Sequence, residues 1–284
     1  IKDGCDSGLA DALKPGMDIP YVDGRNQGGG RAGVLIAGKA DKIRFEDVSM
    51  RCLYPTKTQA EVLCIRNKSD NATAFVRCRF YSQQDTLLPG GGYNWFYDCY
   101  VEGDTDFIWG GNSACLFESC EVEMITSGGR GFNARVKANN IGYVFSECSL
   151  TVAEGVTKCR LLEGSDGTGM VDNITFVNTT IDKEFFSGGI NSEDKSMVPI
   201  AGYDDIRYND GNNVVSLGED TGIKDGCKMY NCTYYDGENK KSVQESGVNG
   251  ADRIHTLTLE EYNQYFKDRS TVLGGYADTT WFTE

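Results

Sequence analysis

Histidine is almost missing from this 284-residue chain, which has one, His255. A Ser-His-Asp or Cys-His site would have to use that residue, and a metal site with several histidines is excluded. Carboxylates are therefore the expected acid–base groups of any enzyme with this composition. Positive charge is also scarce, since 28 Lys and Arg stand against 42 Asp and Glu, a net charge of −14. This balance argues against nucleic acid and against an anionic membrane surface as partners.

Long apolar runs are missing as well. No stretch of 18 or more apolar residues occurs, which predicts that no transmembrane helix is present. Ile1 opens directly into charged, glycine-rich sequence without the apolar segment of a signal peptide. None of the 11 cysteines forms a C-x-x-C pair, so the usual zinc-site spacing is not found. Only 5 prolines accompany 35 glycines, a composition typical of proteins with many tight turns.

Five of the 11 cysteines recur inside a short strand-like phrase. The phrase has an aromatic residue or Met, two mostly polar residues, a small residue that is usually Cys, a variable residue and an apolar one. The small residue occupies positions 48, 78, 99, 120, 148, 179 and 232. Repeats of about 20–30 residues with one short strand each are typical of a solenoid, and these phrases are too short for helical repeats. We therefore predict a β-solenoid in which equivalent small residues and equivalent aromatic residues stack.

Three further features complete this interpretation. The last step between phrases is long and implies either a coil without the phrase or a loop excursion, for which 183–226 is the candidate. Free cysteines behave as small buried apolar residues, so those of the phrase are interpreted as core, although some could pair in an extracellular protein. Thr258 and Glu261 form a capping-box pattern that predicts a short helix over 258–268, within a C-terminal tail 256–284 that covers the solenoid.

Two aspartates occupy equivalent positions on successive repeats. Asp85 follows Cys78 by seven residues, and Asp106 follows Cys99 by seven residues. A solenoid coil would therefore place the two carboxylates about 5 Å apart, one strand spacing. Carboxylates this close titrate at different pH, which leaves an ionised nucleophile or base beside a protonated acid. The alternative is that both are turn residues, because Asp is common in turns.

Four linked segments resemble the successive signatures of pectin methylesterases, the carbohydrate esterases that remove methyl groups from galacturonate esters. They are Gln59-Ala-Glu-Val-Leu63, Gln84-Asp-Thr-Leu87, Cys99-Tyr-Val-Glu-Gly103 and Asp106-Phe-Ile-Trp-Gly110. The resemblance runs from about residue 31 to the C-terminus and is strongest over 43–150. It implies an all-β fold, a right-handed parallel β-helix, formed by 1–284 as a single domain.

The resemblance also implies roles for individual residues. Asp106 resembles the family's nucleophile, and Asp85 resembles the general acid that later acts as base. Gln84 and Gln59 resemble the pair that stabilises the oxyanion. Trp109 and Tyr93 are assigned to the substrate cleft, because exposed aromatic residues stack on sugar rings. No metal or organic cofactor is implied. The expected enzyme is a secreted (extracellular or periplasmic) monomer that acts on methyl-esterified pectin or a related uronate polysaccharide.

Two departures from the family pattern bear on activity. The family carries Leu-Gly-Arg-Pro-Trp downstream of the nucleophile, whereas the matching stretch here has Glu163 or a neighbouring residue at the expected arginine position. An ionised Asp106 needs a cation, without which we expect low activity. Four arginines are candidates, and the first is preferred for its sequence position: Arg160, Arg130, Arg135 and Arg207. Residues 1–30 also do not match the family's N-terminal coils, so this end of the β-helix is expected to differ.

Two other functions remain open on the same fold. A solenoid that lacks the arginine could bind carbohydrate without turnover. Two carboxylates about 5 Å apart also suit a retaining glycoside hydrolase, and polysaccharide lyases share the scaffold. Retention of both aspartates and both glutamines favours the esterase over a binding protein. The paired Gln-Asp-Thr-Leu and Asp-Phe-Ile-Trp-Gly segments favour it over a hydrolase or lyase.

Overall fold

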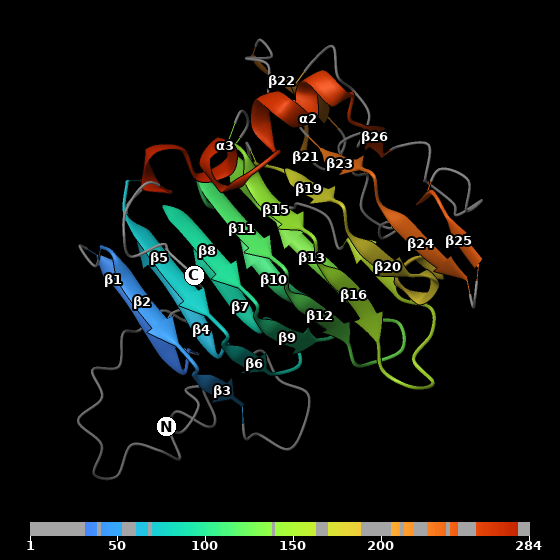
Figure 1. The fold of residues 1–284 in the computed structure, drawn as a ribbon, viewed down its shortest axis with the longest axis horizontal. Helices are drawn as coiled ribbons and strands as arrows, with labels where there is room; N and C mark the ends of the chain where they lie inside the picture. The colour runs from blue at the N-terminus through green and yellow to red at the C-terminus, as the bar shows by residue number, and fades with distance from the viewer. Residues whose placement is uncertain are drawn as a thin grey trace.

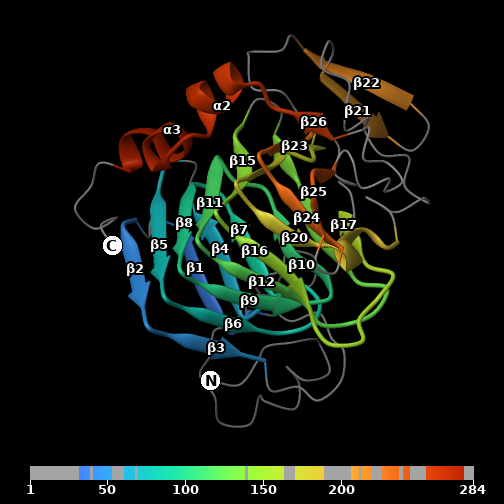
Figure 2. The same ribbon diagram turned by 45° about the vertical axis from the view of Figure 1, so that its right-hand side comes forward.

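The computed structural model describes residues 32–38, 41–52, 61–67, 70–137, 140–162, 170–188, 206–210, 213–218, 226–236, 239–243 and 254–277. Successive coils of the chain contribute one strand each to three long sheets, as the colour sequence in Figure 1 shows. Figure 2 shows these sheets as the sides of one coiled structure. The predicted parallel β-helix is confirmed.

The three sheets are named here sheets 1, 2 and 3. Sheet 1 contains β1 (Val34–Gly38), β4 (Leu63–Asn67), β7 (Leu87–Gly90), β10 (Thr105–Gly110), β13 (Arg130–Ala134) and β17 (Arg160–Leu162). Sheet 2 contains β2 (Ile43–Glu46), β5 (Ala72–Val76), β8 (Tyr93–Tyr97), β11 (Ala114–Glu118), β15 (Gly142–Ser146), β19 (Ile174–Val177), β23 (Cys227–Tyr230) and β26 (His255–Thr256). Sheet 3 contains β3 (Ser49–Arg51), β6 (Arg79–Tyr81), β9 (Tyr100–Gly103), β12 (Glu121–Met124), β16 (Ser149–Val152), β20 (Thr180–Asp182), β24 (Thr233–Asp236) and β25 (Asn239–Lys241). Within these sheets the strands pair in parallel, except that β25 runs antiparallel to β24.

A left-handed backbone residue makes each corner between sheet 2 and sheet 3. Seven such residues have φ between 49° and 55°: Asp47, Arg77, Asp98, Ser119, Glu147, Asn178 and Asn231. Each stands directly before the small residue of the repeated phrase. The sharp turn directs that small residue into the interior, where a larger side chain would collide with the neighbouring coils.

The interior contains the two stacks that the phrase predicts. Six rings stack face to face with centroids 4.5–5.4 Å apart, namely Phe45, Phe75, Phe96, Phe117, Phe145 and Phe176. The thiols of the phrase lie beside them, and each Sγ donates to a carbonyl of the preceding coil, at 3.4 Å for Cys99 and 3.3 Å for Cys120. Burial raises the pKa of both thiols, so the reactive thiolate is scarce at neutral pH. The interpretation of these cysteines as core residues is confirmed.

The long step between the last two phrases is an excursion. β23 pairs directly with β19, and Asn231 Nδ2 donates to Asn178 Oδ1 at 2.8 Å across the two corners. The β-helix therefore continues directly from β19 to β23. The described residues of the segment between them include a 3-10 helix η2 (Lys183–Phe186) and the antiparallel strands β21 (Ile206–Asp210) and β22 (Asn213–Gly218). A further antiparallel pair joins β14 (Val136–Lys137) to β18 (Met170–Val171).

Two short helices cover the outer face of sheet 2 (Figure 1). They are α2 (Leu259–Tyr265) and α3 (Arg269–Leu273), followed by the 3-10 turn η5 (Gly274–Tyr276). The capping box of Thr258 and Glu261 is present as predicted, but the predicted helix over 258–268 ends early. Asp268 starts a second helix by accepting from the Thr271 amide, which breaks the first. In the described part of the chain, no helix has the length and hydropathy to cross a membrane.

Arg269 fastens these helices to the β-helix. Its guanidinium lies 4.0 Å above the ring of the buried Trp95, and its Nε donates to Glu118 Oε2 at 3.0 Å. We expect Arg269→Gln to lower the free energy of unfolding by about 1 kcal/mol, because a half-buried cation–π contact and ion pair are lost together. Lys267→Gln is the matched control, since Lys267 forms an exposed ion pair of 3.7 Å with Asp268. Urea unfolding measures both, and equal effects would contradict this role of Arg269.

Candidate active site

Strand register places the two predicted aspartates side by side. Leu87 on β7 pairs with Ile108 on β10, and the Asp85 amide donates to the Thr105 carbonyl at 3.0 Å. In a parallel ladder these pairings make Asp106 the direct neighbour of Asp85. Adjacent strands lie about 4.8 Å apart, so the sequence prediction of one coil spacing agrees with the register.

Both aspartates have the left-handed backbone conformation, with φ of 64° at Asp85 and 50° at Asp106. They do not belong to the corner series, because they lie at sheet 1 and not between sheets 2 and 3. Asp and Asn are the non-glycine residues that adopt this region most readily. The same unusual backbone on adjacent coils gives the two side chains equivalent starting directions.

Their exposure differs. Asp85 is 4% exposed, whereas Asp106 is half-buried, as is Gln84 directly before Asp85. Gly103 lies at the bend where β9 passes into β10, and a Cβ there would lie 2.1 Å from the Cβ of Phe107. Glycine is therefore required for β10 to fold back closely enough to present Asp106. This explains the glycine that ends the Cys-Tyr-Val-Glu-Gly segment.

Trp109 lies on the same strand as Asp106 and is half-buried. The guanidinium of Arg135 lies 5.2 Å from the centroid of the Trp109 ring. Arg135 was one of four cation candidates in the sequence, but its contact with Trp109 had no sequence signal. A predicted sugar-stacking residue and a predicted cation are thus neighbours on sheet 1.

Tyr93 lies on a different sheet from Asp106 and Trp109. It lies on β8 in sheet 2, and its ring stacks on Tyr276 of η5 with centroids 4.1 Å apart. The predicted cleft role of Tyr93 does not agree with this position, because a C-terminal turn covers the ring. Gln59 and Glu163 lie outside the described residues.

The other three arginine candidates lie on β13, β17 and β21. Arg160, the preferred one, directs its Nε to the Gly188 carbonyl at 3.0 Å. Arg130 pairs in register with Thr105 on one side and with Arg160 on the other. Arg207 lies on β21, where only the backbone is described. Which of the four guanidinium groups reaches Asp106 stays a prediction.

Tyr143 supports the far end of β10 and was not predicted. Its hydroxyl donates to the Gly110 carbonyl at 2.9 Å from β15 across the interior, and burial raises its pKa. Tyr143 pairs in register with Cys115 of β11. A tyrosine thus stands where the neighbouring coil has a cysteine, and this difference is the signal that the sequence offered. This hydrogen bond steadies the strand that carries Asp106 and Trp109.

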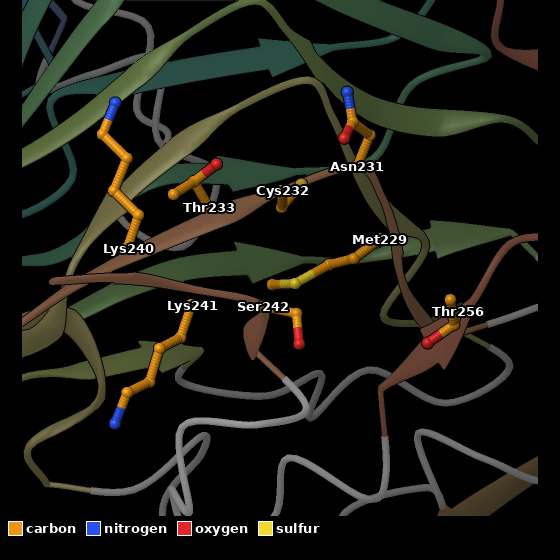
Figure 3. Close-up of a pocket in the computed structure, with 8 residues that line it drawn as sticks. All are labelled: Met229, Asn231, Cys232, Thr233, Lys240, Lys241, Ser242 and Thr256. Atoms are coloured by element: carbon orange, nitrogen blue, oxygen red, sulfur yellow. The ribbon is translucent and has the colours of Figure 1, made fainter.

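A pocket of about 410 Å³ lies at the other end of the molecule. Met229 lies at its centre, and the side chains of Lys240 and Lys241 extend in opposite directions from the edge strand β25 (Figure 3). Lysines on an edge strand discourage pairing with another chain. The pocket is four strands along sheet 2 from β8, so it is separate from the aspartate pair. Among the described residues, no group of three or more His, Cys, Asp or Glu could hold a metal ion.

Part of the chain is similar to known pectinesterases. Residues 32–161, which are less than half of the chain, match the family model Pectinesterase. Pectinesterase 31 of Arabidopsis thaliana is 33% identical over 126 residues, which are 43% of this chain and 37% of that protein. The chain thus spans less than half of that relative's length, and it spans 27% of probable pectinesterase 8 of the same plant.

Solved structures extend the likeness in fold beyond residues 32–161. Pectin methylesterase from carrot has a TM-score of 0.60 at 17% identity, covering 89% of this chain and 72% of that one. A pectin methylesterase in complex with a hexasaccharide has a TM-score of 0.58 at 16% identity, covering 88% and 74%. At this identity the comparison shows a shared fold, the parallel β-helix.

Proposed function

We propose that this chain hydrolyses the methyl esters of galacturonate in pectin and releases methanol. The observation that carries the proposal is the register of Asp85 beside Asp106 within the residues that match the Pectinesterase family model. The hexasaccharide bound to a structural neighbour supports an oligosaccharide substrate. The aspartate pair alone would also suit a glycosidase, and the family match favours the esterase.

In the proposed reaction, Asp106 is the nucleophile. It is the more exposed member of the pair, so a polymer can reach it. Its carboxylate attacks the ester carbonyl, and the resulting oxyanion accepts hydrogen bonds from the amides of Gln84 and Gln59. Collapse breaks the bond to the methoxy group, Asp85 donates the proton, and methanol leaves an anhydride on Asp106.

The second half of the reaction restores the enzyme. Asp85, now a carboxylate, takes a proton from water, and the hydroxide attacks the anhydride. The bond to Asp106 breaks, which releases galacturonate and leaves Asp85 protonated for the next cycle. Each proton taken up by Asp85 comes from water, and each one lost goes to methanol, so one ester consumes one water.

The proposed setting is outside the cell, with the chain acting as a monomer on the polysaccharide and not on nucleic acid or membranes. The net charge of −14 supports this setting. Methylated pectin is nearly neutral and can approach an acidic surface, whereas the anionic product is repelled.

Methanol release from highly methylated pectin tests the proposal. We expect methanol without new reducing ends, because the ester is cleaved and the chain of sugars is not. New reducing ends would instead identify a glycoside hydrolase or lyase. Binding of pectin with no methanol from any esterified uronan, at high protein concentration, would identify a non-catalytic binding protein and overturn the proposal.

A further inference from the structure

Backbone hydrogen bonds join the two segments that carry the aspartates. The Asp85 amide donates to the carbonyl of Thr105, the residue directly before Asp106, at 3.0 Å. The Asp104 amide donates back to the Gln83 carbonyl at 2.8 Å. The two segments are therefore held together just before each aspartate or at it. These bonds use backbone groups, so no change of side chain removes them directly.

One side chain adds a further bond between the same segments. Thr86 directly follows Asp85, is fully buried, and donates from Oγ1 to the Glu102 carbonyl at 2.8 Å. Glu102 directly precedes Gly103, which lies at the bend between β9 and β10. The Thr86 hydroxyl thus connects the residue after the proposed acid to the entrance of the strand that carries the proposed nucleophile.

The backbone at Asp85 depends on such support. Its φ of 64° is unfavourable for a residue with a side chain, and a conformation of this kind persists only where the surrounding contacts fix it. Here the amide of Asp85 is fixed by Thr105, and the next residue is fixed by the Thr86 hydroxyl. Without that hydroxyl, the backbone of Asp85 can relax and move its carboxyl group. A displacement of about 1 Å in a reacting group can cost a hundredfold in rate.

We propose that Thr86 is a positioning residue, whose hydroxyl fixes the backbone of Asp85 against the bend before β10 and so sets the separation of the two carboxylates. This inference rests on the proposed esterase function, in which Asp85 must reach the leaving methoxy group while Asp106 holds the acyl group. Thr86 itself touches no reacting atom. Serine could supply the same hydroxyl, whereas valine has nearly the same shape and lacks it.

Thr86→Val should lower kcat for methanol release from methylated pectin by about tenfold to a hundredfold. KM should change little, because a fully buried residue does not touch the polymer. Thr86→Ser should recover most of the wild-type kcat. Thr73→Val is the matched control, since Thr73 on sheet 2 is also fully buried and donates to Asn94 Oδ1 at 2.6 Å. The control should lower the unfolding midpoint by a similar amount and leave kcat unchanged.

Amide hydrogen exchange tests the same contact without turnover. The Asp85 amide should exchange about tenfold faster in Thr86→Val than in wild type, and at the wild-type rate in Thr86→Ser and Thr73→Val. Unchanged exchange in Thr86→Val would overturn the positioning role. So would equal losses of kcat in Thr86→Val and Thr73→Val, or a Thr86→Ser variant as slow as Thr86→Val.

The two measurements also separate this inference from the proposed function. A wild-type chain that releases no methanol would contradict the esterase, while faster exchange confined to Thr86→Val would still support the role of Thr86 in holding Asp85. Methanol release by wild type with an unchanged kcat in Thr86→Val would support the esterase and overturn the positioning role.

Discussion

Asp106→Asn should lower methanol release from methylated pectin by at least about a thousandfold, which is typical when a nucleophile is removed. Asparagine is the informative replacement because it tolerates the φ of 50° at this position, whereas alanine would add backbone strain. The amide keeps the shape of the side chain and cannot form the anhydride. Methanol release and thermal unfolding should be measured on the same preparation, and the unfolding midpoint should change by less than about 2 °C.

Asp85→Asn is the matched variant one coil away, with a φ of 64° that asparagine also accepts. It should reduce turnover strongly while leaving Asp106 able to attack, so a small burst of methanol can precede a slow steady rate. The roles proposed for the pair would be contradicted if Asp106→Asn stayed within tenfold of wild type while Asp85→Asn abolished methanol release.

Phe117→Ala should lower the free energy of unfolding by about 3–5 kcal/mol, the usual cost of emptying a buried aromatic site. Phe117 is fully buried, and its ring stacks on Phe96 at 4.5 Å and on Phe145 at 4.8 Å. In a solenoid each coil is stabilised mainly by its two neighbours, so a gap in the middle of the stack weakens two coil interfaces. Urea unfolding followed by circular dichroism measures the loss.

Phe45→Ala is the control at the end of the described stack. Phe45 is half-buried and stacks on Phe75 at 5.4 Å. Fewer stacking contacts and less buried area are lost, so the effect should be clearly smaller than for Phe117→Ala. Equal losses at the two positions would show that stability does not follow the nearest-neighbour stacking argued here.

Some parts of the candidate site could be predicted from the sequence and others could not. The pairing of Asp85 with Asp106 could be predicted because coil length alone decides which residues meet on adjacent coils, and the repeated phrase reveals the coil length. The choice among arginines could not be predicted. Arg160 is preferred for its position in sequence and its Nε donates to the Gly188 carbonyl, while Arg135 lies over Trp109, and the arginine that reaches Asp106 stays a prediction.

The sequence by itself determined the β-helix, because a small residue, usually Cys, and an aromatic residue or Met recur in successive coils and are buried together by stacking the coils. It also determined the capping box of Thr258 and Glu261, a contact between residues three apart. Only the tertiary structure decided that Tyr93 stacks on Tyr276, since those rings are separated by most of the chain. Repeats specify neighbours along the coil axis. Side-chain direction and the path of a non-repeating tail depend on packing in three dimensions. Such packing produces no periodic pattern in the sequence.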